Sequence, residues 1–332
     1  MKLDEIAKLA GVSRTTASYV INGKATQYRI SKKTQEKVMK IVDEKGFRPN
    51  HAATMLRAGQ SRTLGLIVPD LENQSYARLA TKLELQAREH DYQLIICCSD
   101  DNPDNEKAVA HWLKERQVDL LFVASCQHPQ HCSYQQMRKQ LPVIALDRPL
   151  DESQFISIIN DDYTGAQQLT ELLLEGKPQQ IALIGAHPDL PISQQRQSGF
   201  EQAVVACQHA PELKTYYTEL FDHQQAKQLM EKLVRDNQVP DAILCTSFTL
   251  MEGVLETLSP DSSLLGRIQL ATFGDHRLLD LLPTAIHSLS QSPEKIAQLA
   301  IEKALELLSK EAAPGIITLP RTLIKRRREI AS

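Results

Sequence analysis

The sequence lacks an apolar run long enough to cross a bilayer, and its cysteines form no paired pattern. Six cysteines occur in 332 residues, and none of them makes a CxxC pair. No apolar stretch approaches the roughly 20 residues that a transmembrane helix needs. The N-terminus, MKLDEIAKLA, has no basic segment followed by an apolar one, as a secretory signal would have. We therefore expect a cytoplasmic protein with reduced thiols and no membrane partner.

Familiar catalytic and metal-binding motifs are also missing. No phosphate-binding GxxxxGK[ST] or GxGxxG, no GxSxG and no HExxH is present. The segment CQHPQHC, residues 126–132, concentrates soft ligands, but its spacing matches no usual zinc site, so we expect a polar loop. We expect no enzyme, no catalytic residue, no metal and no cofactor. A sugar-modifying enzyme that uses two strand-end carboxylates stays an alternative, because the sequence gives no distance between them.

Charge is distributed unevenly along the chain. Residues 1–60 contain 12 Lys and Arg against 5 Asp and Glu, a net charge of +7, whereas the rest of the chain carries −10. A basic head on an acidic body is typical of nucleic-acid binding.

The basic head has the pattern of a helix-turn-helix. An apolar stripe predicts a helix over 3–10, and Gly11 allows the sharp turn that ends it. Ser13 is placed to cap a second helix over 14–21. Two helices across so short a turn form a helix-turn-helix, although a bare pattern of this kind also fits an exposed helix on any small bundle.

The first residues of the second helix have side chains that can contact base edges in a major groove. Arg14 can donate two hydrogen bonds to guanine, and the methyl groups of Thr15 and Thr16 suit thymine, with Ser18 and Tyr19 one turn further on. We therefore predict that this helix reads double-stranded DNA.

Two further helices are predicted before the body begins. Ser31 caps a third helix over 32–44, and Gly46 is placed to stop it. After it, Asn50 can cap a short helix of small residues that ends at Leu56, before a glycine-containing linker.

The body alternates apolar runs with helical spacers. Eight runs recur from residue 63 onward, which predicts parallel sheets covered by helices on both faces. Ligands of such sheets bind at the carboxyl ends of the strands. Polar residues that close these runs are Asp70, Asp100, Asp147, Arg148, Ser247 and Asp275.

The stretch DEIAKLAGVSRTTASYVING, followed by KVMKIVDEKGFRPNHAA, resembles the head of the LacI–GalR family. The resemblance implies that residues 50–57 form a hinge helix that folds on DNA and inserts Leu56 into the minor groove; ordinary helix packing is the alternative for Leu56. The segment GKATQYRIS is longer than the usual family loop, and it resembles a branch that responds to fructose phosphates. The implied DNA contacts are Ser13, Arg14, Thr15, Thr16, Ser18, Tyr19, Asn22, Asn50, Ala53, Leu56 and Arg57.

The body resembles the core of the same family, which implies a two-lobed α/β fold like that of periplasmic binding proteins behind a small all-α head. The implied effector residues are Ser75, Tyr76, Asp147, Arg148, Arg196, Phe221, Ser247, Asp275 and Gln291. Many family members have asparagine where this chain has Ser247. Structural ion pairs are the alternative for the charged members of this set, and a core position is the alternative for Phe221.

The same family resemblance implies the boundaries of the domains and bears on the assembly of the protein. We expect a head over 1–47, a hinge and linker over 48–61, and lobes over 62–160 plus 288–320 and over 161–287 plus 321–332. No leucine heptad follows the final KRRRE, which we interpret as the solvated end of the last strand. The dimer and the tetramer both stay open.

The resulting hypothesis is a transcription regulator, repressor or activator, of carbon-metabolism genes. Arginines can hold a phosphate, and carboxylates can accept hydrogen bonds from sugar hydroxyls. The resemblance implies release from operator DNA by fructose 1-phosphate or fructose 1,6-bisphosphate. A family regulator with a different effector, and a sugar-binding module without DNA activity, are the alternatives.

Overall fold

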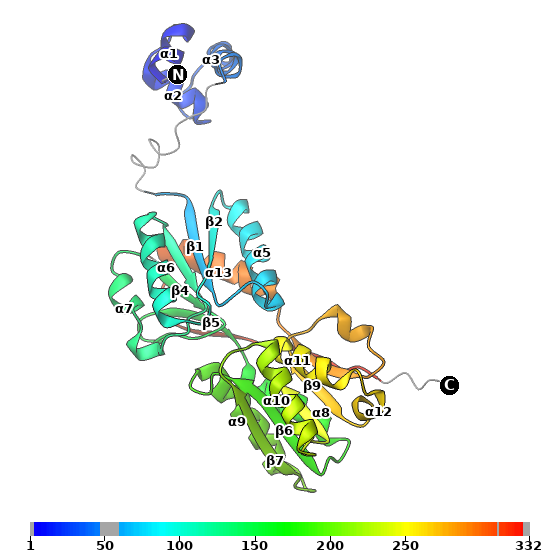
Figure 1. Cartoon of the computed structure of the whole chain (residues 1–332). Helices are drawn as coiled ribbons and strands as arrows, with labels where there is room; N and C mark the ends of the chain where they lie inside the picture. The colour runs from blue at the N-terminus through cyan, green and yellow to red at the C-terminus, as the bar shows by residue number, and fades with distance from the viewer. Residues whose placement is uncertain (1–2, 47–59, 311, 328–332) are drawn as a thin grey trace. The chain divides into compact units, whose positions relative to one another are not determined.

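The computed structural model describes residues 3–46, 60–310 and 312–327, and the chain divides into two units after Ser61. The first unit is the head, and the second is a two-lobed core (Figure 1). No helix in the described ranges is both long enough and apolar enough to span a membrane.

The described part of the head is a three-helix unit, as the sequence predicted. Its helices are α1 (Leu3–Ala10), α2 (Arg14–Ile21) and α3 (Lys32–Glu44). Gly11 has a φ of 65°, which glycine adopts without strain, so α1 can end in a sharp turn. The predicted caps form: Ser13 Oγ accepts from Thr16 N at 3.0 Å, and Ser31 Oγ accepts from Thr34 N at 3.3 Å. The head core consists of Ile6, Ala10, Val20, Ala25, Val38 and Val42.

Each lobe of the core contains one six-stranded sheet. The first sheet has the order β11-β5-β4-β3-β1-β2, and the second has the order β12-β10-β9-β8-β6-β7. All neighbours are parallel except β12, which runs antiparallel to β10. The strands of the first sheet are β1 (Thr63–Val68), β2 (Gln93–Cys98), β3 (Leu120–Val123), β4 (Val143–Leu146), β5 (Ile156–Asn160) and β11 (Gly315–Leu319). Those of the second are β6 (Gln180–Ala186), β7 (Glu212–Thr218), β8 (Ala242–Cys245), β9 (Gln269–Phe273), β10 (Ile286–Ser290) and β12 (Thr322–Ile324).

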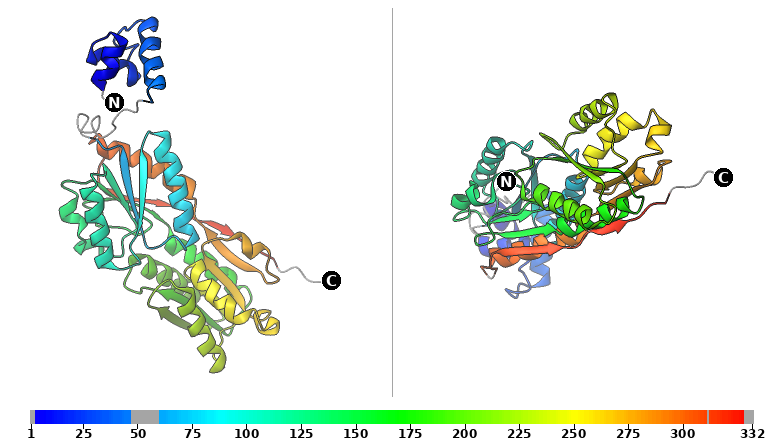
Figure 2. Two further views of the ribbon diagram at one scale, coloured as in Figure 1. Left: turned by 45° about the horizontal axis from the view of Figure 1, so that its top comes forward. Right: turned by 90° about the horizontal axis from the view of Figure 1, so that it is seen from below.

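Helices cover both faces of each sheet, which confirms the predicted α/β layering (Figure 2). In the first lobe they are α5 (Gln74–Glu89), α6 (Pro103–Glu115), the short η1 (Pro129–His131) and α7 (Tyr134–Met137), and α13 (Pro293–Leu308). In the second lobe they are α8 (Asp162–Leu174), α9 (Pro191–Ala206), α10 (His223–Arg235), α11 (Phe248–Leu258), α12 (Ser262–Leu265) and η2 (Arg277–Asp280).

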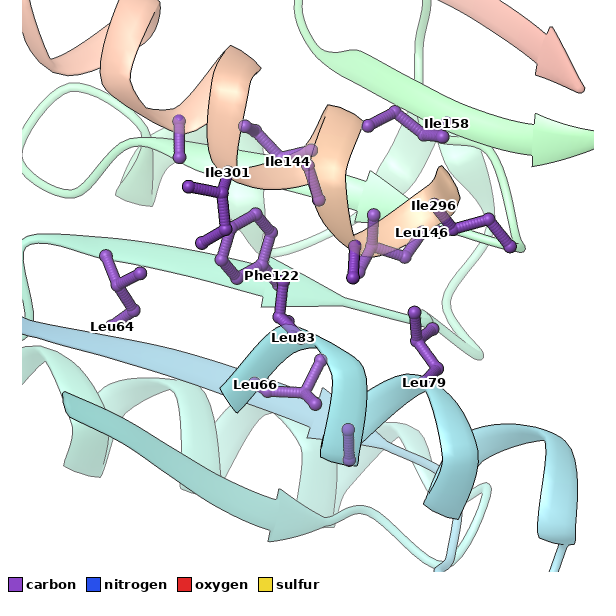
Figure 3. Packing of buried hydrophobic residues seen from close by; sticks show 14 of the residues in the cluster. Leu64, Leu66, Leu79, Leu83, Phe122, Ile144, Leu146, Ile158, Ile296 and Ile301 are labelled. Carbon is purple, nitrogen blue, oxygen red and sulfur yellow. The ribbon is translucent and has the colours of Figure 1, made fainter. Parts of the chain in front are cut away.

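Branched and aromatic side chains fill the space between the first sheet and helices α5 and α13. Figure 3 shows Phe122 and Ile144 of the sheet against Leu83 of α5 and Ile301 of α13, all of them buried. Helix α13 comes late in the sequence, yet it completes the core of the first lobe. The two lobes are therefore interleaved in sequence, and neither is one continuous segment.

The chain crosses between the lobes three times, at β5–α8, β10–α13 and β11–β12. We expected the second crossing after residue 287, but β10 continues to Ser290 and pairs with β9, so the crossing comes later. Strands β7, β10, β11 and β12 were not among the eight predicted runs. β7 is an edge strand that is only half-buried, so its sequence ELKTYYT shows no continuous apolar run.

Candidate functional site

A cleft between the two lobes is the candidate effector site. It is lined by strand ends of both sheets and by segments that connect the lobes. The carboxyl ends of parallel strands meet there, as expected for a ligand site in this type of sheet. Eight of the nine predicted effector residues line it: Ser75, Tyr76, Asp147, Arg148, Arg196, Phe221, Ser247 and Gln291.

Asp147 lines the cleft and belongs to a network that joins the first lobe and a lobe crossing. It follows β4 with a φ of 64°, and its side chain is buried. Tyr76 OH donates to Asp147 Oδ2 at 3.0 Å, and Gln291 Nε2 donates to Oδ1 at 3.2 Å. Carboxylate oxygens accept several hydrogen bonds, so Asp147 is suited to sugar hydroxyls.

Two arginines that line the cleft share one carboxylate partner, and we call Arg196 and Arg321 the inner arginine pair. Arg196 Nε and Arg321 Nε donate to the same oxygen, Asp162 Oδ1, at 3.2 and 2.8 Å. Arg196 Nη1 also donates to the Thr246 carbonyl at 2.6 Å. Both guanidinium groups lie over the ring of Phe273, at 4.5 and 5.2 Å from its centroid. These contacts hold both arginines in place.

Arg321 and Asp162 were not among the residues predicted from the sequence. Arg321 lies between β11 and β12, and Asp162 is the first residue of α8, so both belong to lobe crossings. Burial lowers the pKa of Arg321, and Asp162 opposes that effect. A lone arginine near the end of a chain gives no sequence signal that it reaches a cleft.

A second cluster, which we call the outer cluster, contains Asp101, Arg148 and Phe221 of the cleft lining and His187 beside them. Arg148 donates to both carboxylate oxygens of Asp101, with the Nη2–Oδ2 contact at 3.1 Å. His187 Nε2 lies 3.4 Å from Asp101 Oδ2, so Asp101 bridges the two lobes. The Phe221 ring lies 5.7 Å from the His187 ring and 6.0 Å from the Arg148 guanidinium. Neither Asp101 nor His187 was predicted from the sequence.

Asp101 is held in its ionised form. Burial by itself raises the pKa of this carboxyl, but Arg148 and His187 outweigh burial and hold the pKa far below its usual range. The outer cluster therefore keeps the negative charge of Asp101 beside Arg148.

Asp275, the ninth predicted effector residue, does not line this cleft. Its Oδ1 accepts from Ser288 Oγ at 2.7 Å and from Arg326 Nη2 at 2.8 Å. Arg326 also binds Asp280 at 2.8 Å. Arg326 is thus largely buried, so our interpretation of KRRRE as a solvated strand end was wrong for this residue, whereas Lys325 is exposed.

Ser247 combines a structural role with its place in the cleft. Its Oγ accepts from Leu250 N at 3.2 Å and so caps helix α11. This contact occupies one acceptor position of the hydroxyl and leaves its O–H group to donate to a ligand.

The predicted DNA-contacting residues of the described head lie on and beside α2. Ser13, Arg14, Thr15 and Asn22 are exposed, and Arg14 Nε lies 3.2 Å from Asp4 Oδ1 in an exposed ion pair. Thr16 Oγ1 lies 2.8 Å from Ser13 Oγ, and Asn22 Nδ2 donates to Ser18 Oγ at 3.1 Å.

The long loop after α2 carries a second aromatic residue. Tyr28 stacks on Tyr19 with ring centroids 3.6 Å apart and an interplanar angle of 2°. The predicted hinge residues Asn50, Ala53, Leu56 and Arg57, and the hinge helix, lie outside the described residues.

The cysteine- and histidine-containing loop after β3 is organised by a buried carboxylate. Glu106 Oε1 accepts from Ser125 Oγ at 2.6 Å, Gln127 Nε2 at 2.8 Å and Tyr134 OH at 2.9 Å. Its Oε2 accepts from Cys126 N at 2.7 Å. Within the described ranges, no group of three His, Cys, Asp or Glu side chains is placed to hold a metal ion. The loop is thus built around hydrogen bonds to Glu106.

Two family models match the sequence. Residues 2–50 match "Bacterial regulatory proteins, lacI family", and residues 61–262 match "Periplasmic binding proteins and sugar binding domain of LacI family". The "Fructose operon regulatory protein" of Vibrio cholerae is 48% identical over 324 residues, which cover 97% of this chain and 99% of the relative. The "Catabolite repressor/activator" of Escherichia coli is 43% identical over 331 residues, covering 98% of each.

Two solved structures are also similar to this chain. The Cra transcriptional dual regulator of Pseudomonas putida, in complex with fructose 1-phosphate, is 43% identical and has a TM-score of 0.76, covering 80% of this chain and 99% of that one. The Lac repressor dimer bound to operator and an anti-inducer has a TM-score of 0.83 over 99% of this chain and 98% of that one. At 21% identity, this second likeness shows the fold alone.

Proposed function

Because the chain belongs to the LacI family of bacterial regulatory proteins, we propose that it is a cytoplasmic repressor or activator of carbon-metabolism genes that a fructose phosphate releases from operator DNA. It is a DNA-binding transcription regulator and not an enzyme. The heads of a homodimer, or of two dimers in a homotetramer, would read the half-sites of a pseudo-palindrome.

The observation that carries the effector proposal is the set of polar groups that converges in the cleft. The inner arginine pair supplies positive charge for a phosphate, and Asp147 supplies acceptors for sugar hydroxyls. Phe221 adds an apolar face to the lining of the cleft. These three kinds of contact match the phosphate, the hydroxyls and the apolar ring face of a sugar phosphate.

The proposed DNA contacts rest on the exposed face of α2. Arg14, Thr15 and Asn22 are exposed there, on a head segment with a net charge of +7. Helices presented in this way enter a major groove, and basic side chains around them neutralise phosphates. We place the remaining contacts, by resemblance, in the hinge segment 48–61.

The three lobe crossings suggest how an effector would act on the rest of the molecule. Asp162, Gln291 and Arg321 lie on these crossings, and each belongs to the cleft or binds a residue that lines it. A ligand that contacts them binds one arrangement of the lobes better than another. Differential binding of this kind is the condition for shifting a conformational equilibrium and lowering operator affinity.

The test is fluorescence anisotropy on a pool of labelled palindromic operator fragments at fixed salt. We expect tight, sequence-selective binding of the full chain, and release when fructose 1-phosphate is titrated into the complex but not when fructose is. Selective binding that ignores the sugar phosphate would point to a family regulator with a different effector. Failure to bind any fragment would leave a sugar-binding module without DNA activity.

Arg196→Ala separates effector recognition from DNA binding. The substitution removes half of the inner arginine pair but leaves Asp162 paired with Arg321. We expect operator binding within twofold of the unmodified protein and at least a tenfold higher fructose 1-phosphate concentration for half-release, the loss expected for a charge-assisted contact. Arg88→Ala, at an exposed ion pair on α5, is the matched control. Unchanged release by the Arg196 variant would exclude Arg196 from the effector site.

A further inference from the structure

Tyr19 and Tyr28 form an aromatic pair on the surface of the head. Tyr19 belongs to α2, whereas Tyr28 belongs to the segment between α2 and α3. Their rings are parallel to within 2°, with centroids 3.6 Å apart. Hydrogen bonding to Tyr28 raises the pKa of Tyr19, so the two hydroxyl groups lie at the same end of the pair. Tyr28 is 47% exposed, and neither ring belongs to the head core.

The segment that carries Tyr28 has a defined conformation. Tyr28 N donates to the Lys24 carbonyl at 3.2 Å, and Ile30 N donates to the Ala25 carbonyl at 2.9 Å. Ala25 belongs to the head core, and Ile30 packs against that core. Gln35 Nε2 of α3 also donates to the Ile30 carbonyl at 2.7 Å. These contacts anchor the segment on both sides of Tyr28 and limit where its ring can lie.

Tyr19 lies on the face of α2 that carries proposed DNA contacts. Thr15 is four positions before it and Asn22 three positions after it, and residues with these spacings are neighbours on a helix surface. Both neighbours are exposed. A tyrosine at such a position can adopt several rotamers, and it loses that freedom when it binds DNA. Stacking on Tyr28 restricts the Tyr19 ring before DNA binds, which lowers the entropic cost of the contact.

We propose that Tyr28 is a positioning residue for DNA recognition, which holds the Tyr19 ring in the orientation that α2 presents to a major groove. This inference rests on the proposed function, because it assumes that α2 reads base edges. Tyr28 then affects the choice of DNA sequence through Tyr19, without contacting a base itself. A residue that only stabilised the head would weaken binding to every sequence alike.

A double-mutant cycle on the full chain tests this inference. The probes are the palindromic fragment that binds most tightly in the pool described above and a fragment of equal length with a scrambled sequence. Fluorescence anisotropy at fixed salt gives the sequence preference, which is the Kd for the scrambled fragment divided by the Kd for the palindromic one. Tyr28→Leu removes the ring and Tyr28→Phe keeps it, and Tyr19→Leu is made alone and together with Tyr28→Leu. Gln27→Leu, at the neighbouring exposed position, is the matched control.

We expect Tyr28→Leu to reduce the sequence preference about five- to tenfold, the loss expected for one well-oriented base contact. Tyr28→Phe and Gln27→Leu should stay within about twofold of the unmodified protein, because both keep the stacked rings. In the Tyr19→Leu background, Tyr28→Leu should change the preference by less than about twofold, since no ring is left to position. Thermal melting checks that each variant folds, and Tyr28→Met replaces Tyr28→Leu if that variant does not.

Three results would overturn the role of Tyr28 and leave the proposed function intact. Equal weakening on both fragments by Tyr28→Leu would give Tyr28 a purely structural role. An undiminished effect of Tyr28→Leu in the Tyr19→Leu background, or an equal effect of Tyr28→Phe, would mean that Tyr28 acts independently of the stack. An unchanged preference in Tyr19→Leu would mean that Tyr19 reads no base. If the unmodified protein shows no sequence preference, the proposed function itself is wrong, and the inference fails with it.

Discussion

Buried acidic residues in this chain are held by many donors, and Glu106 is the most fully enclosed of those described above. It is 0% exposed, and four donors from two segments, the loop after β3 and helix α7, converge on its two oxygens. Three of those donors come from the loop after β3. A single side chain of α6 therefore determines the conformation of a loop about twenty residues further along the chain.

Glu106→Gln tests this role. An amide in place of the carboxylate turns one acceptor into a donor that faces other donors, so we expect a loss of about 2 to 3 kcal/mol in the free energy of unfolding. Urea denaturation followed by circular dichroism measures it. Glu115→Gln, on the same helix but 66% exposed, should change stability by less than about 0.5 kcal/mol. Equal effects of both substitutions would contradict the assigned role.

Asp275 gives a prediction for pH dependence. Burial raises the pKa of its carboxyl, but hydrogen bonds from Arg326 and Ser288 outweigh burial and lower the pKa below the usual 3.8. A carboxyl with a lowered pKa stabilises the fold above its unfolded-state pKa, and this contribution disappears as the pH falls below about 4.

Asp275→Asn should therefore destabilise the protein by about 1 to 3 kcal/mol at pH 7, the range for a charged hydrogen-bonded group. The difference from the unmodified protein should stay constant between pH 5 and 7 and shrink between pH 4 and 3. Urea denaturation at each pH gives the comparison. Asp280→Asn, which shares Arg326 but is 62% exposed, should cost less than about 1 kcal/mol. A difference that grows on acidification would contradict the argument.

At the scale of elements, the position of Arg196 depends on how closely α8 and α9 pack. Gly199 lies three residues beyond Arg196 on α9, and a Cβ there would come within 2.2 Å of the Tyr163 carbonyl oxygen and 2.9 Å of Ala166 Cβ. Only glycine lets the two helices approach so closely. Since α8 begins at Asp162, the same packing brings Arg196 to its carboxylate partner.

Gly199→Ala should push the helices apart. We expect a loss of about 1 to 3 kcal/mol in stability, the usual cost of overpacking, and a several-fold weaker affinity for the sugar phosphate. Thermal melting and calorimetry measure the two effects. Val205→Ala, on the same helix but 78% exposed, should leave both unchanged. Full effector affinity in the Gly199 variant would separate Arg196 positioning from this helix contact.

At the scale of the whole molecule, the uneven distribution of charge separates the two binding activities. The segment 1–60 carries +7 and the remainder −10, so the core contributes no attraction to DNA. The proposed effector cleft, in contrast, contains charges that are paired with one another and largely shielded from salt.

Operator affinity should therefore fall steeply with salt, by about a thousandfold between 50 and 200 mM if about six phosphates are contacted. Affinity for the sugar phosphate should change by less than about tenfold over the same range. Anisotropy and calorimetry on one preparation test both. Equal salt dependence of the two would mean that DNA binding does not rest on the charge of the head.

The sequence by itself determined what depends on neighbouring residues. Capping serines, turn glycines and apolar periodicity predicted the three head helices and the alternating body, because these features depend on residues a few positions apart. Edge strands such as β7 were not predicted, because half-exposed strands show no continuous apolar run. Eight of the nine effector residues that the family resemblance implied line the cleft.

Only the tertiary structure decided which charges meet. Asp101 and His187 approach from different lobes, and Arg321 reaches Asp162 from 159 positions away. Asp275 has the expected residue type, yet Arg326 holds it away from the cleft described above. Coulombic and hydrogen-bond energies depend on distance in space and on burial, neither of which can be read from the spacing of residues along the chain.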